Sequence, residues 1–148
     1  MDIGSGNGYP SAALSNFAPH PFVIDGVECN SMEGFLQSLK FASVDMQKYV
    51  CTLVGKEAKF KGKHKKWWRT QTLYWLGKPI ARQSDEYQKL LDRAFNALSQ
   101  NPGFRDALEA THGCVLTHSI GKSDKTKTVL TQAEFCSRLT KLRDIGRL

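Results

Sequence analysis

The sequence has no long hydrophobic run, few cysteines and no cluster of histidines. No stretch approaches the roughly 20 apolar residues of a membrane-spanning helix, and the opening MDIGSGNGYP lacks the basic and apolar regions of a signal peptide. We therefore expect no membrane partner, no disulfide framework and no metal site, but reduced, mostly buried thiols in a cytoplasmic protein. The cysteines are widely spaced and include no C-x-x-C pair: Cys29, Cys51, Cys114 and Cys136.

Acidic residues are also outnumbered, because 14 Asp and Glu stand against 21 Lys and Arg, which leaves a net charge of +7. A basic surplus of this size indicates an anionic partner, and nucleic acid, a nucleotide or a phosphosugar would each satisfy it. The remaining composition is ordinary for a globular protein, with 41% hydrophobic and 24% charged residues. A chain of 148 residues can bury a hydrophobic core without disulfides or a structural metal. We expect a single domain over residues 1–148.

Turn and capping residues predict the elements of the first part of the chain. Residues 1–20 are rich in glycine and proline and are expected to form a loop. Asp25-Gly26, between short apolar runs, predicts a hairpin near residues 22–29, because both central positions of its turn require positive φ. Ser31 is placed to cap a helix that begins near Met32.

The rest of the chain is predicted to be mainly helical. Asp45 is expected to cap a second helix, which Gly55 ends or bends. The segment TLYWLGKPIAR is expected to form a hairpin around Gly77-Lys78, although a helix over Trp67–Trp75 also fits. Together these signals predict a predominantly helical α+β domain with four to six helices and a small β component. Further helices are indicated by their capping residues: Ser84, Asn101 followed by Pro102, and Thr131 with Glu134.

The helix near Met32 carries a polar stripe opposite its apolar side. Glu33, Gln37 and Lys40 follow the i, i+4, i+7 spacing of one helix face. A solvated face is the commoner outcome for such a stripe. The alternative is the wall of an active site, in which Glu33 stabilises an oxocarbenium-like centre or activates a water at a glycosidic carbon. Gln37 and Lys40 would then orient a sugar or a phosphate.

Seven basic residues lie between residues 56 and 69, interleaved with aromatic ones. The run is either a solubilising surface or a patch that follows a nucleic-acid backbone or anchors a phosphate. Trp67 or Trp68 could then offer a stacking face to a base. Because adjacent residues rarely face the same way, we expect one of these two tryptophans in the core.

A second basic segment, THSIGKSDKTKT, spans residues 117–128. Its glycine and its lysines could hold a phosphate through backbone N–H groups and Lys122 or Lys125. The spacing is not that of a Walker A loop, and taken by itself the segment is a weak signal.

Read in order, these segments resemble the signature of the NADAR or YbiA-like proteins. That signature runs (F/L)-S-N-F, a short gap, an apolar strand, D-G and then S-x-E-H-x-x-Q-x-x-K-F. Weaker similarity continues through AKFKGK, LSQNPGFRDALEAT and LTKLRD, so the resemblance covers nearly the whole chain and is nearest to short phage-encoded members. The positions that match the signature are Ser15, Asn16, Phe17, Asp25, Gly26, Ser31, Glu33, Gln37, Lys40 and Phe41.

The resemblance implies a YbiA-like α+β fold, no cofactor and N-glycosidase chemistry. Characterised relatives cleave the bond between a ribose carbon and a base-like nitrogen, in phosphorylated riboflavin-pathway intermediates or in ADP-ribosylated guanine of nucleic acid. The implied partner is an ADP-ribose-type nucleotide or ADP-ribosylated nucleic acid. Glu33 would be the central carboxylate and Lys40 a covalent (Schiff-base) or electrostatic participant. The implied substrate-binding residues are Ser15, Asn16, Phe17, Gln37, Lys59, Gly62, Trp68, His118, Gly121 and Lys122.

Two departures from the family pattern affect the expected site. Gly34 stands where the family has a histidine, which would remove one side chain from the site. The segment 117–128 replaces the family's E-x-(T/S)-x-x-D-x-x-W-G, so a second acid is missing or displaced to Asp124. A non-catalytic binder of ADP-ribose, of an NAD-derived nucleotide or of nucleic acid therefore remains an alternative to the enzyme.

Overall fold

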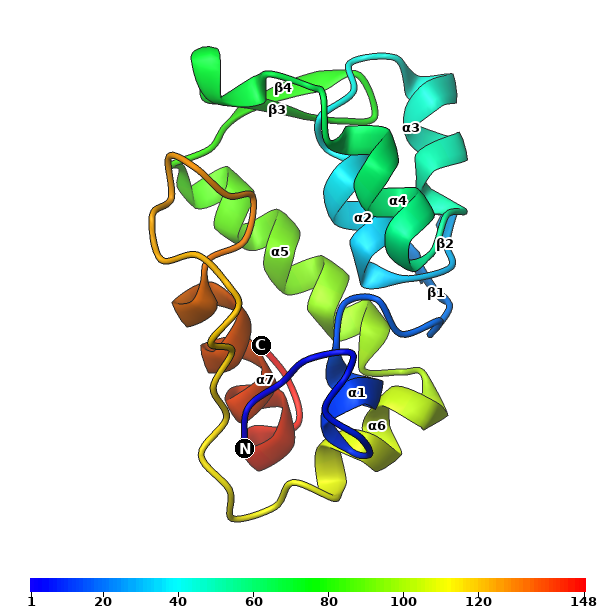
Figure 1. Cartoon of the computed structure of the whole chain (residues 1–148). Helices are drawn as coiled ribbons and strands as arrows, with labels where there is room; N and C mark the ends of the chain where they lie inside the picture. The colour runs from blue at the N-terminus through cyan, green and yellow to red at the C-terminus, as the bar shows by residue number, and fades with distance from the viewer.

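The computed structural model describes all 148 residues and contains seven α-helices, one 3-10 helix and two antiparallel hairpins (Figure 1). This confirms the α+β prediction, with one helix more than the expected maximum. The helices are α1 (Ser11–Leu14), α2 (Met32–Ser38), α3 (Val44–Cys51), α4 (Gly55–Gly62), the 3-10 helix η1 (Trp67–Arg69), α5 (Asp85–Leu98), α6 (Pro102–Glu109) and α7 (Gln132–Ile145). The strands are β1 (Phe22–Ile24), β2 (Val27–Cys29), β3 (Thr72–Trp75) and β4 (Lys78–Ala81).

The extra helix, α1, lies within residues 1–20, which were expected to be a loop. Its single turn of Ser11–Leu14 is held by tertiary packing, because Leu14 is buried and α1 packs against α6. A segment this short has little helical tendency by itself. Its sequence therefore offers no periodic pattern from which it could be predicted.

Both hairpins form, and their turns follow the expected chemistry. Asp25 and Gly26 adopt φ of 49° and 78°, as a turn with two positive φ angles requires. The second turn is centred on Leu76 and Gly77, with φ of 50° and 83°, one residue earlier than predicted. The alternative helix over Trp67–Trp75 is wrong, because only the single turn of η1 is helical there.

Most predicted helix caps are confirmed. The side chains of Ser31, Ser84 and Asn101 accept hydrogen bonds from the first turns of α2, α5 and α6, and Thr131 begins α7 with a complete capping box. Asp45 is not a cap, because the Ser43 hydroxyl accepts from the Met46 N–H and α3 begins two residues earlier than predicted.

The turn between α3 and α4 also differs from expectation. α3 already ends at Cys51, and Gly55 is the first residue of α4, with a φ of 58°. That positive φ is readily adopted by glycine and lets the chain reverse into the next helix. Because of this reversal, α4 packs beside α2 and α3.

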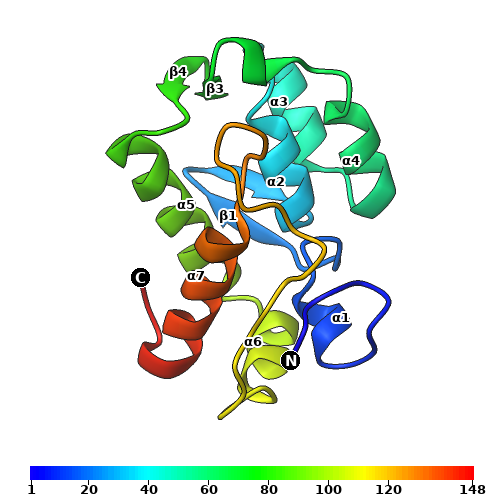
Figure 2. The ribbon, with the colours of Figure 1, turned by 60° about the vertical axis from the view of Figure 1, so that its left-hand side comes forward.

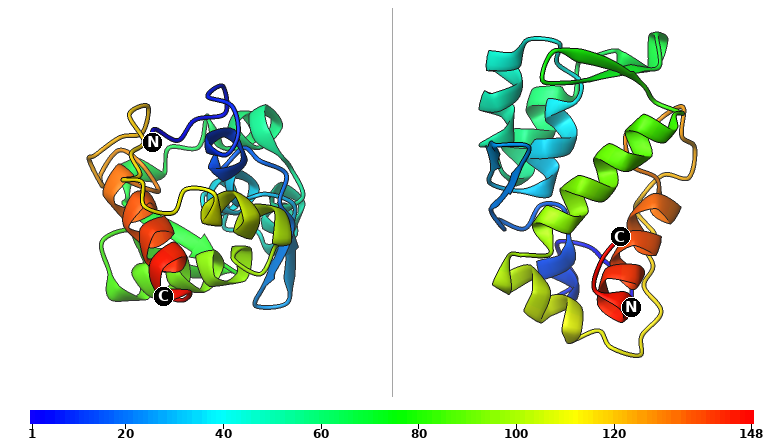
Figure 3. Two further views of the ribbon diagram at one scale, coloured as in Figure 1. Left: turned by 90° about the horizontal axis from the view of Figure 1, so that it is seen from below. Right: turned by 180° about the vertical axis from the view of Figure 1, so that it is seen from behind.

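α5 runs diagonally through the molecule (Figures 1 and 3). The group α2, α3 and α4 lies at one end, and α1, α6 and α7 lie at the other. Tyr87, Leu91 and Phe95 on the inner face of α5 are fully buried and belong to one continuous core. None of the helices combines the length and the hydropathy that crossing a bilayer demands.

The predicted burial of single residues is largely confirmed. Trp67 is 7% exposed and belongs to the core, whereas Trp68 is 50% exposed, as expected for adjacent residues. All four cysteines are free thiols. Cys29 and Cys51 are buried and the other two are partly exposed.

Candidate functional site

A cleft of about 390 Å³ lies among the start of the chain, α2, α4 and the loop before α7. Figure 2 shows this loop, which spans residues 118–130, passing in front of α2. Nine of the twelve predicted site residues line the cleft, although they come from four separate parts of the sequence. They are Ser15, Asn16, Phe17, Glu33, Gln37, Lys59, His118, Gly121 and Lys122.

Local hydrogen bonds place Glu33 at the wall of this cleft. The Ser31 hydroxyl accepts from the Gly34 N–H at 3.0 Å, which starts α2 immediately before Glu33. The Glu33 N–H donates to the Asn16 carbonyl at 3.0 Å, which holds the loop that carries Asn16 against the first turn of α2. The helix start and the S-N-F segment are therefore joined by one backbone bond. Glu33 is only 9% exposed at this position.

Burial changes the electrostatics of Glu33 and its neighbours. Desolvation raises the pKa of Glu33, opposed by the hydrogen bond from Gln37 and by the charges of Lys40 and Lys59. The Gln37 Nε2 donates to the Glu33 Oε1 at 2.9 Å. Desolvation lowers the pKa of Lys40, which the charge of Glu33 opposes and that of Lys122 reinforces. The charges of Lys40 and Lys59 thus act on Glu33, and Lys122 adds a further cation to the cleft lining, which leaves the site electropositive.

Two of the predicted site residues, Lys40 and Gly62, do not line the cleft. The Lys40 Nζ donates to the Gly62 carbonyl at 3.5 Å. A Cβ at position 62 would stand 1.9 Å from the Gln37 Oε1, so any other residue there would displace the Gln37 side chain. Gly62 therefore allows Gln37 to keep this position. The expected approach of Gly62 to a phosphate stays a prediction.

Trp68, the third predicted residue outside the lining, is attached to the loop by a bridging side chain. The Gln71 Nε2 donates to the Trp68 carbonyl and to the Thr126 carbonyl, both at 2.9 Å. Because of this bridge, η1 and the basic loop form adjoining parts of one surface. The expected contact of Trp68 with a base stays a prediction.

The loop 118–130 is held in place from both sides. The Gln132 Nε2 donates to the Gly121 carbonyl at 2.6 Å, and the Gln132 N–H donates to the Lys122 carbonyl at 2.9 Å. A Cβ at position 121 would stand 2.5 Å from the ring of His118, so this close approach also requires glycine. The contacts keep His118, Gly121 and Lys122 at the cleft.

A buried ion pair that the sequence reasoning missed supports the other end of this loop. Arg82 is fully buried and donates to both carboxylate oxygens of Glu134, at 3.1 and 2.7 Å. It also donates to the Thr128 carbonyl at 2.9 Å, and the Tyr87 hydroxyl donates to the Val129 carbonyl at 2.5 Å. Arg82 and Glu134 are separated by 52 residues, so no local sequence signal could have paired them.

Two expectations about the site need correction. A Cβ at Gly34 would lie 2.5 Å from the Leu53 carbonyl, so position 34 faces the end of α3 and not the cleft. A side chain there is therefore not missing from the site. Asp124 does not replace the absent acid, because it is exposed, lies outside the cleft lining and accepts hydrogen bonds from Thr126.

No three His, Cys, Asp or Glu side chains come together in a group that could hold a metal ion. The polar groups that the cleft offers to a ligand are one carboxylate, amides, hydroxyls, an imidazole and ammonium groups. Such a set can bind an anionic sugar phosphate, and a buried carboxylate beside it can act on a developing positive charge.

Comparison with known proteins gives a family and a fold. The model of the family described as bacteriophage protein GP30.3 matches residues 8–144. An uncharacterized 17.1 kDa protein of the Gp30–rIII intergenic region of Enterobacteria phage T4 is 45% identical over 149 residues, which cover 97% of each chain. The NMR structure of the E. coli protein YbiA is similar with a TM-score of 0.62 at 18% identity, over 99% of this chain and 83% of YbiA. The predicted YbiA-like fold is therefore confirmed.

Proposed function

This chain belongs to the bacteriophage protein GP30.3 family, and on that premise we propose that it is a cytoplasmic N-glycosidase of the NADAR type that requires no metal. The reaction is hydrolysis of the bond between a ribose carbon and a base nitrogen. The observation that carries this proposal is a buried carboxylate, Glu33, in a cleft that otherwise offers cations and neutral polar groups. The S-N-F and S-x-E-x-x-x-Q-x-x-K segments of the NADAR resemblance supply residues to this cleft.

The chemistry follows from what each group faces. Cleavage of an N-glycosidic bond builds positive charge on the ribose carbon, and a carboxylate in a water-poor site stabilises that charge strongly. Glu33 fills this role or activates the nucleophile. Asn16 and Gln37 orient the ribose. Lys40 lies outside the cleft lining, so of its two expected roles the electrostatic one, through its charge on Glu33, fits better than the covalent (Schiff-base) one.

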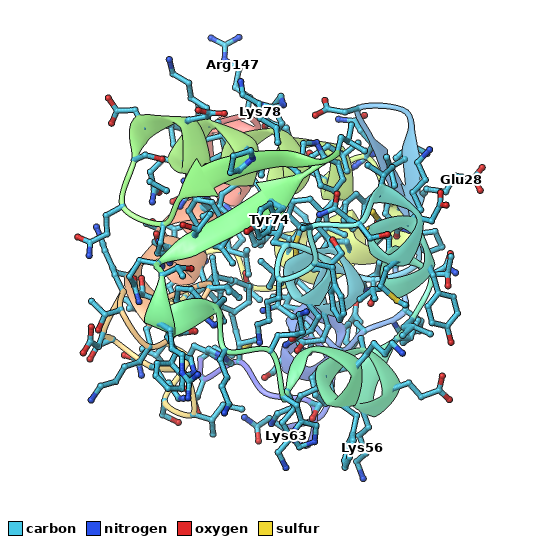
Figure 4. All side chains as sticks on the ribbon, turned by 90° about the horizontal axis from the view of Figure 1, so that it is seen from above. Glu28, Lys56, Lys63, Tyr74, Lys78 and Arg147 are labelled. Atoms are coloured by element: carbon cyan, nitrogen blue, oxygen red, sulfur yellow. The ribbon has the colours of Figure 1, made fainter.

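The charge pattern around the cleft supports an ADP-ribose-bearing nucleic acid as the substrate. Seven cations between residues 56 and 69 form no ion pair, and Lys59 among them reaches the cleft. Figure 4 shows Lys56 and Lys63 projecting from the same side of the molecule. Unpaired cations that extend beyond the cleft can contact several phosphates of a nucleic-acid backbone, whereas a single mononucleotide would contact only those at the cleft. The sharpest form of the proposal is removal of ADP-ribose from guanine bases of nucleic acid.

The test compares the wild type with Glu33→Gln on an oligonucleotide that carries ADP-ribosylated guanine, with the products separated by chromatography. Loss of the carboxylate should lower kcat by at least ~10²-fold, since acid–base groups typically contribute ~10²–10⁴-fold. Glu57→Gln is the matched control, because Glu57 is exposed on α4 and lies outside the cleft lining. Full turnover by Glu33→Gln would refute the assigned mechanism. Turnover only on phosphorylated riboflavin-pathway intermediates would move the proposal to that substrate class.

A non-catalytic binder of ADP-ribose is the second candidate, and one observation favours it. No acid other than Glu33 lines the cleft, since Asp124 lies outside it. Calorimetry with ADP-ribose, run in parallel with product analysis, separates the two proposals. A binder releases heat and forms no product, whereas the enzyme forms free ADP-ribose from the modified oligonucleotide.

A further inference from the structure

His118 is held at the cleft in a defined orientation. Its Nδ1 lies 2.8 Å from the carbonyl oxygen of Ile3, a fully buried residue. A carbonyl oxygen can only accept a hydrogen bond, so Nδ1 carries the proton of this bond. The ring also packs edge to face on buried Phe135, with 5.0 Å between the ring centroids. These two contacts fix both the tautomer and the plane of the neutral imidazole.

The other ring nitrogen of His118 is free and open. Its Nε2 has no hydrogen-bond partner in the protein and is not one of the two buried unpartnered side-chain atoms, which belong to Gln37 and Gln71. Because Nδ1 holds the proton in the neutral ring, Nε2 presents a lone pair. His118 lines the same cleft as Glu33, and the unpartnered Nε2 is the ring nitrogen that it can offer to a molecule bound there.

We propose that His118 is the catalytic base that complements Glu33, an inference that rests on the proposed N-glycosidase function. In the step, a water oxygen bonds to the ribose carbon while the carbon–nitrogen bond breaks and its electron pair leaves with the base nitrogen. The Nε2 of His118 takes the proton from the attacking water. The imidazolium then returns this proton, through solvent, to the departing nitrogen, so that atoms and charges balance. Glu33 stabilises the positive charge on the ribose carbon during the step.

This role explains how the site can work without a second carboxylate. A glycosidase that uses a water directly needs a base at that water, and with Glu33 assigned to the positive charge on the ribose carbon the imidazole supplies this base. In this protein the loop 117–128 brings an imidazole to the cleft and keeps Asp124 away from it. The bond between Ile3 and His118 spans 115 residues, so the start of the chain positions the base.

The experiment uses His118→Asn, because the Asn side-chain N–H₂ can replace Nδ1 as donor to the Ile3 carbonyl but offers no base. On the ADP-ribosylated oligonucleotide we expect kcat to fall by ~10²–10⁴-fold, with KM within about twofold and the same thermal melting curve, on the principle that the lost interaction acts in the transition state. His112→Asn is the control, since His112 is exposed and lines no part of this cleft. Equal turnover by His118→Asn and the wild type would overturn the assignment.

Azide provides the second measurement. This small anion needs no deprotonation, so it should restore turnover to His118→Asn and yield the ribosyl azide, while leaving the wild-type rate unchanged. An inactive His118→Asn that forms no ribosyl azide would show that His118 is not the base. The two proposals fail separately, because an active wild type with an active His118→Asn refutes only the base. A wild type without turnover on any N-ribosyl substrate refutes both.

Discussion

Replacing Arg82 by Met should destabilise the protein strongly, because it leaves a charge without its partner in the interior. The side chains of Arg82 and Glu134 are 0% and 7% exposed, and the shorter of their two contacts is 2.7 Å. Removing one member of a buried pair typically costs about 3–5 kcal/mol. Burial alone would raise the pKa of Glu134, but hydrogen bonds from Arg82, Thr131 and Gln88 outweigh it and hold the value at about 2, against an ordinary 4.5. These donors favour the charged carboxylate, so removing Arg82 leaves that buried charge less stabilised.

Urea and thermal unfolding of Arg82→Met measure the effect directly. For a chain of this length, a loss of about 3–5 kcal/mol corresponds to a melting temperature lower by about 6–20 °C. The double variant Arg82→Met/Glu134→Gln should be more stable than Arg82→Met alone, because Gln removes the stranded charge and still accepts from the Thr131 N–H. Lys78→Met is the control, since the Lys78–Glu86 pair is 73% and 53% exposed and such pairs contribute ~0–1 kcal/mol.

The same pair predicts a pH dependence. Because the folded-state pKa of Glu134 is depressed, its contribution is complete above about 4.5 and is lost as the pH falls toward about 2. The wild type should therefore lose stability through this window more steeply than Glu134→Gln. A loss below about 1 kcal/mol in Arg82→Met, or a double variant no more stable than the single one, would refute the reasoning.

Two further predictions concern the site and its surroundings. Gly34→Ala should lower the free energy of unfolding by ~1–3 kcal/mol in urea titrations, because the new Cβ would meet the Leu53 carbonyl at 2.5 Å; a stability gain from the higher helix propensity of Ala would contradict this. Trp68→Ala should leave the melting temperature nearly unchanged, since the ring is 50% exposed. It should nevertheless weaken binding of a single-stranded oligonucleotide by ~1–3 kcal/mol per stacked base, measured by fluorescence anisotropy, with free ADP-ribose as the control; unchanged oligonucleotide affinity would remove Trp68 from the binding surface.

The elements that could be predicted are those whose causes lie within a few residues. The Asp25-Gly26 turn and the caps Ser31, Asn101 and Thr131 each depend on contacts that span no more than three residues. Where two local solutions compete, the prediction was wrong. Ser43 rather than Asp45 caps α3, and the Gln47 side chain in its first turns is buried, donates to two carbonyls and accepts a backbone N–H from distant parts of the chain.

The candidate site was predicted in part for a similar reason. Glu33 and Gln37 lie on one helix, so their spacing alone predicted that they share a face. That the face borders a cleft and not solvent depends on α4 and on the loop 118–130, which arrive from distant parts of the chain. Whether a side chain at position 34 would face the cleft depends on how closely the end of α3 approaches α2, and no pattern within α2 predicts this.

The amino-acid sequence by itself determined the class of fold, the turns and caps, the basic character of the surface and the residues that could do chemistry. Tertiary structure decided which of those residues meet. Ile3 and His118 are 115 residues apart, and Arg82 and Glu134 are 52 apart, yet both pairs help to shape one cleft. The physical reason is that burial, desolvation and the choice of a histidine tautomer depend on neighbours supplied by the fold, whereas a turn or a cap depends on neighbours supplied by the chain.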